Sequence, residues 1–98
     1  MNIDSKKDGG SLAVKVSGRL DTMKAPELEE FLNQSLEDVT ELTVDLSELE
    51  YISSSGLRAL LGAQQTMENQ GSMIVKNIPQ PIMEILEVTG FTAFLTIE

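Results

Sequence analysis

The chain contains three consecutive serines followed by a glycine, Ser53 to Gly56. Their clustered hydroxyl groups are the side chains in this sequence most suited to chemistry at a single site. They separate residues 42–46, where apolar and polar side chains alternate, from residues 57–61, where leucines recur at helical spacing. The serines are therefore predicted to lie at a helix N-terminus, where free N–H groups and the helix dipole favour negative charge. A hydroxyl there can cap the helix, or it can accept a phosphoryl group.

The residue types leave both interpretations open. A cap needs one serine, which contributes about 1 kcal/mol through its bond to a free backbone N–H. Three serines exceed that requirement, and Gly56 costs about 1 kcal/mol relative to alanine inside a helix. The glycine suggests that another group approaches the backbone closely at this point.

Catalysis by these serines is not supported by the rest of the sequence. A serine nucleophile needs a base within hydrogen-bond reach, and the chain has no histidine and no cysteine. It contains no Ser-x-x-Lys or Gly-x-Ser-x-Gly motif and no glycine-rich nucleotide-binding loop. We therefore expect a protein that is not an enzyme and that has no catalytic residue, metal or cofactor. A small enzyme using serine and carboxylates alone is the remaining alternative.

Size and charge restrict the class of protein further. The 98 residues suffice for a single domain, residues 1–98. Seven basic and sixteen acidic residues give a net charge of −9, which opposes direct binding to nucleic acid or anionic membranes. The charge can serve solubility, or it can steer the protein toward a basic partner. Without a membrane-length apolar run or a leader-like N-terminus, a cytoplasmic protein is the simplest interpretation.

The elements that must position the serines follow from periodicity and turn signals. Five strands are predicted, at residues 2–7, 12–17, 42–46, 72–77 and 94–97. Three helices are predicted, beginning between residues 22 and 25, at the serines, and near residue 81. Gly71 and Gly90 are expected to end the second and third helices. The order β-β-α-β-α-β-α-β indicates an α/β fold in which helices pack on a small mixed sheet.

The chain as a whole resembles the STAS domain, which is found in anti-sigma factor antagonists. The central signature is represented by Asp-Leu-Ser at residues 45–47 and Ser-Ser-Gly-Leu at residues 54–57. Gly-Arg-Leu-Asp at 18–21, Gly-Ser at 71–72 and Val-Thr-Gly-Phe at 88–91 are similar to other landmarks of the family, in the right order. There are two departures. Ser53 stands where the family often has an acid, and the chain stops where many members add a C-terminal helix.

The resemblance implies which residues carry the function. It makes Ser55 the phosphorylation site, with Ser54 as second choice. The implied partner-binding residues are Asp21, Thr22, Ser53, Ser54, Gly56, Leu57 and Arg58. Two of these have an alternative role, since Asp21 could cap the first helix and Arg58 could be a solvated side chain instead of pairing with an acidic partner.

By the same resemblance the protein is an anti-sigma factor antagonist. Its implied partners are an anti-sigma factor that is also a serine kinase of the histidine-kinase-like ATPase fold, and a PP2C-type phosphatase. The unphosphorylated domain would sequester the anti-sigma factor and the phosphorylated domain would release it. The alternative is a STAS scaffold or accessory subunit of a transporter or lipid-trafficking assembly, which has no phosphorylation cycle.

Overall fold

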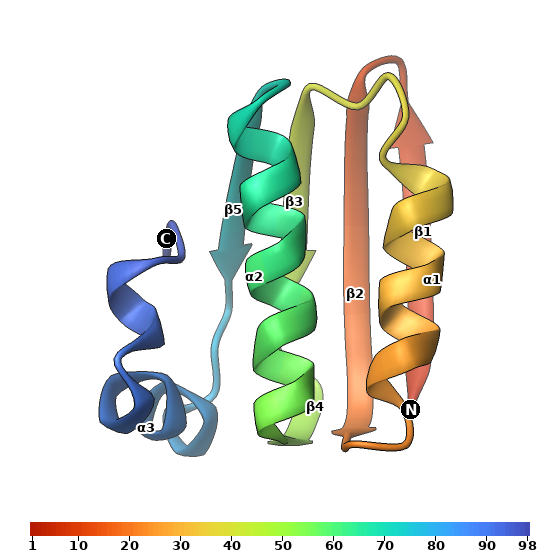
Figure 1. Ribbon diagram of the computed structural model, residues 1–98. Coiled ribbons are helices and arrows are strands. Elements are labelled where there is room, and N and C mark those ends of the chain that lie inside the picture. Colours follow the sequence, from red (N-terminus) through yellow and green to blue (C-terminus); the bar gives the residue numbers. More distant parts are fainter.

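The computed structural model describes all 98 residues and places three helices against a five-stranded sheet. The strands are β1 (Asn2–Asp8), β2 (Ser11–Leu20), β3 (Glu41–Asp45), β4 (Leu49–Ile52) and β5 (Ser72–Lys76). The helices are α1 (Ala25–Ser35), α2 (Ser54–Glu68) and α3 (Gln80–Thr89), followed by a short 3₁₀ helix, η1 (Phe91–Ala93). The predicted α/β class with a small mixed sheet is confirmed (Figure 1).

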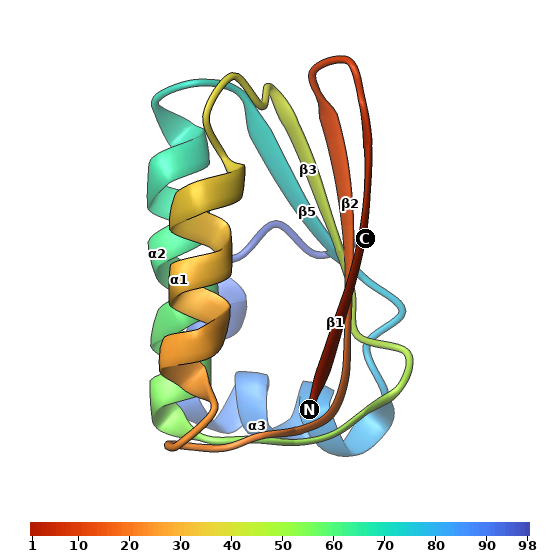
Figure 2. The same cartoon turned by 90° about the vertical axis from the view of Figure 1, so that its right-hand side faces the viewer.

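The order of the strands explains why the sheet is covered on one face. The main sheet runs β1-β2-β3-β5, in which β1 is antiparallel to β2 and the other neighbours are parallel. The connections through α1 and α2 both step in the same direction along the sheet. Because such crossovers are right-handed, both helices must lie on the same side. Figure 2 shows α1 and α2 together on one face, and α3 contacts β4 at one end of the sheet.

Alternation along the strands separates the core from the open face. Val14, Val16 and Val44 point toward the helices and are buried. They belong to one core of 24 buried apolar residues between the sheet and the helices. On the open face the neighbouring positions of β2 and β3, such as Lys15 and Asp45, are more exposed and polar. Apolar and polar residues therefore alternate along these strands because only one face of the sheet packs against helices.

One predicted strand is absent from the structure, and one strand of the structure was not predicted. The segment at residues 94–97 is not a strand, because the chain turns through η1 and only Ile97 forms an isolated bridge, to Val75. Strand β4 was not predicted at all. It has four residues, and a register shift between Gly18 and Arg19 leaves two successive exposed residues in β4. A bulge of this kind removes the alternation on which strand prediction depends.

The predicted helix boundaries agree with the structure better than the predicted role of Gly71 does. Helix α1 begins at Ala25, inside the predicted window, and Gly90 ends α3 in the left-handed conformation with φ of 81°. Helix α2, however, ends at Glu68, and Gly71 does not have a positive φ. A Cβ at Gly71 would lie 1.9 Å from the carbonyl oxygen of Thr40. Gly71 is needed for this close approach of two backbones, and the prediction that it is the helix stop was wrong.

Candidate functional site

Ser53 is the residue that caps helix α2. Its backbone is extended, with φ of −90° and ψ of 171°, and its Oγ accepts the N–H of Gly56 at 3.2 Å. Its carbonyl oxygen accepts the N–H of Leu57 at 2.9 Å. The residue is only 8% exposed, and its hydroxyl is engaged in the cap. Capping of α2 therefore requires only one of the three serines, and the other two are not needed for it.

Ser54 and Ser55 occupy the first two positions of the helix. Ser54 is exposed and Ser55 is half-buried, and neither hydroxyl takes part in capping. The first N–H groups of a helix lack intrahelical acceptors, and the Ser53 cap serves only those of Gly56 and Leu57. The first turn carries no acidic residue. This end of α2 therefore presents free donors and a positive dipole to whatever lies in front of it.

The loop after β2 lies beside the serines. The N–H of Ser53 donates to the carbonyl oxygen of Leu20 at 2.9 Å, which brings the ends of β2 and β4 together. The next residue, Asp21, holds the turn before α1, because its Oδ1 accepts the N–H groups of Met23 and Lys24 at 3.1 and 3.0 Å. Thr22 is exposed in the same turn. The Leu20–Ser53 bond thus places the loop that begins at Asp21 beside Ser53, although the two segments are far apart in sequence.

Besides Ser53, two of the residues implied for partner binding are buried. Leu57 is a core residue, and Gly56 is buried beneath the first turn of α2. A Cβ at Gly56 would lie 2.8 Å from Cγ of Leu20 and 2.9 Å from Cγ1 of Ile52. The close approach expected at this glycine therefore comes from the protein's own core. Arg58, in contrast, is exposed and forms no ion pair.

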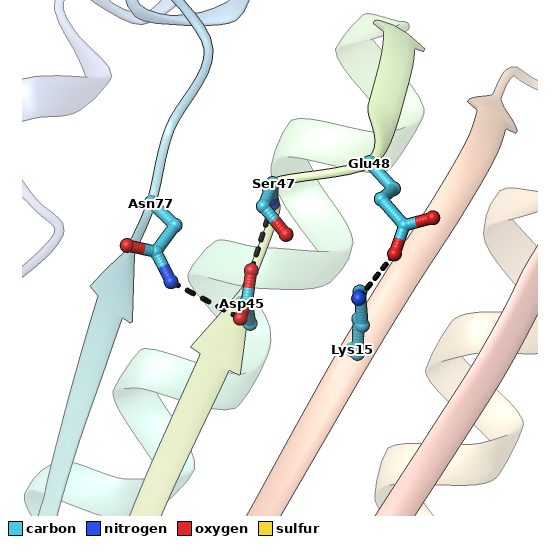
Figure 3. Close-up of polar contacts among 5 residues, drawn as sticks. All are labelled: Lys15, Asp45, Ser47, Glu48 and Asn77. Carbon is cyan, nitrogen blue, oxygen red and sulfur yellow. Dashed lines mark hydrogen bonds and ion pairs between the residues drawn. The ribbon is translucent and has the colours of Figure 1, made fainter.

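A polar network on the open face fixes the connection that leads into β4 (Figure 3). The Asp45 carboxylate accepts the N–H of Ser47 at 2.8 Å and the side-chain amide of Asn77 at 3.1 Å. Nearby, Lys15 forms an ion pair with Glu48, and its hydrogen bond to this carboxylate, together with the negative charge, raises the pKa of Lys15. The network joins the ends of β3 and β5 to the turn before β4. It thereby helps to place the strand that delivers Ser53.

Acid is expected to weaken this network. Partial burial acts to raise the pKa of Asp45, but hydrogen bonds from Ser47 and Asn77 outweigh it and hold the pKa below the ordinary value of 3.8. A lowered folded-state pKa adds stability that is present above the ordinary pKa and is lost as the pH falls through the folded value. Asp45→Asn should therefore lower the melting temperature at neutral pH, and this deficit should shrink below about pH 4. Thermal melts from pH 7 to pH 2 measure it, with Asp4→Asn on the same face as the matched control. A deficit that stays constant with pH would contradict the prediction.

The family follows from comparison with known proteins. Residues 3–96 match the family model described as MlaB, STAS domain. The chain belongs to the STAS domain family. It is 30% identical over 92 residues to an anti-sigma-B factor antagonist of Staphylococcus aureus (strain NCTC 8325 / PS 47), covering 92% of this chain and 85% of the relative. It is 26% identical over 98 residues to the anti-sigma-B factor antagonist of Bacillus subtilis (strain 168), covering 99% and 90%.

Solved structures agree with the fold of this STAS domain. The unphosphorylated form of the anti-sigma factor antagonist SpoIIAA superposes with a TM-score of 0.84 at 16% identity, covering 99% of this chain and 88% of that one. An anti-sigma factor antagonist from Mycobacterium paratuberculosis superposes with a TM-score of 0.87 at 24% identity, covering 98% and 83%. The STAS-like fold predicted from the sequence is confirmed. The sequence relatives place the chain among the anti-sigma factor antagonists, which are binding regulators.

Three further exposed side chains were not singled out from the sequence, one in the turn before α1 and two on the open face of the sheet. Met23, in the turn held by Asp21, is 85% exposed. On the open face of the sheet the Arg19 guanidinium lies 4.5 Å from the centre of the Tyr51 ring, one residue before Leu20 and Ile52 in their strands. An apolar residue in an otherwise polar turn was a usable signal for Met23. The Arg19–Tyr51 pair depends on the unpredicted strand β4.

The STAS domain offers no obvious metal centre. No three acidic side chains are grouped so that they could bind a metal ion. None of its helices has the length and apolar character needed to cross a membrane.

Proposed function

We propose that this STAS domain is an anti-sigma factor antagonist that is switched by phosphorylation of Ser55. The observation that carries the proposal is the division of roles among the three serines. Ser53 caps α2, so the half-buried hydroxyl of Ser55 is left for modification at a helix end that tolerates a dianion. Ser54, the exposed neighbour, is the second choice.

The proposed partner is an anti-sigma factor with serine kinase activity, which supplies the ATP site. It docks over the accessible part of the site, formed by the half-buried Asp21 and the exposed Thr22, Ser54 and Arg58. Ser53, Gly56 and Leu57 support this surface from beneath, since they are buried. A PP2C-type phosphatase restores the serine, and the ATP-dependent cycle takes place in the cytoplasm.

The switch follows from the charge of the phosphate. Phosphorylation adds about −1.5 to −2 charges at neutral pH. The helix dipole accommodates them, so the fold is retained and the change is confined to the docking surface. A contact made with a neutral hydroxyl is then replaced by a hydrated dianion, and the anti-sigma factor is released.

Two comparisons support this proposal. Relatives at 26 to 30% identity are anti-sigma-B factor antagonists, and they match nearly the whole chain. SpoIIAA has been solved in its phosphorylated form as well, and that form superposes on this chain with a TM-score of 0.77 at 16% identity. One backbone arrangement thus resembles both states, as expected for a switch that acts at the surface.

Incubation with the cognate kinase and ATP should add one phosphate to Ser55. Peptide mass spectrometry after proteolysis locates the group, and Ser55→Ala serves as the control that should remain unmodified. Phosphate found on Ser54 would select the second choice. The absence of phosphate from all three serines would refute the proposed switch.

A further inference from the structure

Arg58 has an electrostatically unfavourable position in the unmodified protein. It lies in the second turn of α2, close to the positive end of the helix dipole, where a cation is disfavoured. No acidic residue in the first turn offsets it, and no carboxylate forms an ion pair with it. The lack of a carboxylate partner is unexpected, because the chain has sixteen acidic and only seven basic residues. A local conflict of this kind is expected where a residue serves function and not folding.

The spacing along α2 places Arg58 within reach of the phosphorylation site. It follows Ser55 by three residues and Ser54 by four, and residues at both spacings are neighbours on a helix surface. A guanidinium can hold a phosphate through two parallel N–H···O bonds. Lysine forms no such planar pair, so the residue type matches the anion that the proposed function puts there.

The surroundings leave the Arg58 side chain room to move. Together with Glu29 of α1 it lines a hollow of roughly 320 Å³ between α1 and α2. Glu29 is the one other charged residue that lines this hollow, and no ion pair joins it to Arg58. In the neighbouring loop Asp21 accepts backbone N–H groups of its own turn, and Lys24 pairs with Glu27 at 3.5 Å. Arg58 is therefore the basic residue on this side of the site that is free to take a new anionic partner.

We propose that Arg58 is an internal counter-ion for phosphoserine at position 55 and holds the phosphate against the N-terminus of α2. The inference rests on the proposed function, because it names how this chain receives the modification. Before phosphorylation Arg58 belongs to the exposed docking surface. After phosphorylation it turns to the phosphate, so one event adds the dianion and removes a cation from the surface that the partner contacts.

The test uses protein in which phosphoserine is genetically encoded at position 55, so no kinase is needed. Phosphorus NMR then follows the second ionisation of the phosphate, whose pKa is about 6 without special neighbours. Arg58→Gln should raise this pKa by about 0.5, because the dianion loses its cation. Arg58→Lys should recover part of the difference. Arg19→Gln removes an arginine on the open sheet face and should have no effect.

An unchanged phosphate pKa in Arg58→Gln, or an equal rise in Arg19→Gln, would overturn the inference. All three substitutions are at exposed positions, so correct folding is expected and is checked by the amide NMR spectrum. The absence of phosphate from all three serines after incubation with the kinase would refute the proposed function without altering this measurement. The two ideas can thus fail separately.

Discussion

Replacing Ser55 by aspartate should weaken binding of the anti-sigma factor by about 100-fold or more, whereas Ser55→Ala should bind like the wild type. In the proposed complex, the aspartate would put a hydrated negative charge into a contact formed with a neutral hydroxyl. Its carboxylate cannot be buried there without a partner, and desolvation of an unpaired charge is costly. The loss should lie mainly in faster dissociation, as for other interface substitutions.

Isothermal titration calorimetry with the purified anti-sigma factor measures this difference. Ser72→Asp is the matched control, because it adds the same charge at an exposed position at the start of β5, which is the opposite end of the sheet. Melting temperatures should show that Ser55→Asp is folded, since an acid in the first turn suits the helix dipole. Equal binding by the alanine and aspartate variants would instead favour the constitutive scaffold or accessory subunit.

Gly71→Ala should destabilise the fold by about 3 kcal/mol. The added Cβ would lie 1.9 Å from the carbonyl oxygen and 2.6 Å from the carbonyl carbon of Thr40. Both atoms belong to the backbone, so they cannot swing aside as a side chain can. The same carbonyl oxygen accepts the N–H of Ser72 at 2.9 Å, where the pairing of β3 with β5 begins. Separating the two segments therefore costs sheet pairing as well as packing.

Gly62→Ala is the control for this prediction. Gly62 lies in the middle of α2, and a Cβ there would meet no atom within 4 Å. The same substitution should therefore stabilise the protein by about 0.5 to 1 kcal/mol, because alanine favours the helix. Urea unfolding followed by circular dichroism gives both free energies. If Gly71→Ala proved as harmless as Gly62→Ala, the close approach of Thr40 to Gly71 would be wrong.

The serine-rich start of α2 could be predicted from the sequence because the signals for it are local. Alternation before the serines and leucine spacing after them place a strand and a helix, and the chemistry of a helix N-terminus follows from backbone geometry. The absence of histidine and cysteine argues against nucleophilic catalysis, and this argument requires no knowledge of the fold. The order of the elements, with right-handed crossovers, also predicted a mixed sheet with α1 and α2 as its connections.

Sequence alone could not divide the roles within the serine triplet, because a cap is defined by which hydroxyl points at which N–H. Only the tertiary structure shows Ser53 in that role. Strand β4 was missed for a related reason, since its pairing with β2 depends on a bulge that breaks the alternation. The placement of Asp21 beside the serines likewise depends on β2 and β4 ending together.

Gly56 and Gly71 show most clearly which features could be predicted from the sequence and which required the tertiary structure. From the sequence, Gly56 indicated that a group approaches the helix start, and Gly71 indicated the end of a helix. In the folded chain Gly56 makes room for Leu20 and Ile52, and Gly71 makes room for Thr40. Most of the helices and strands and the hydroxyl-rich helix start could be predicted, because periodicity and turn signals depend on neighbouring residues. Strand β4, the capping hydroxyl and the close contacts of the two glycines could not, because they depend on atoms brought together from distant parts of the chain.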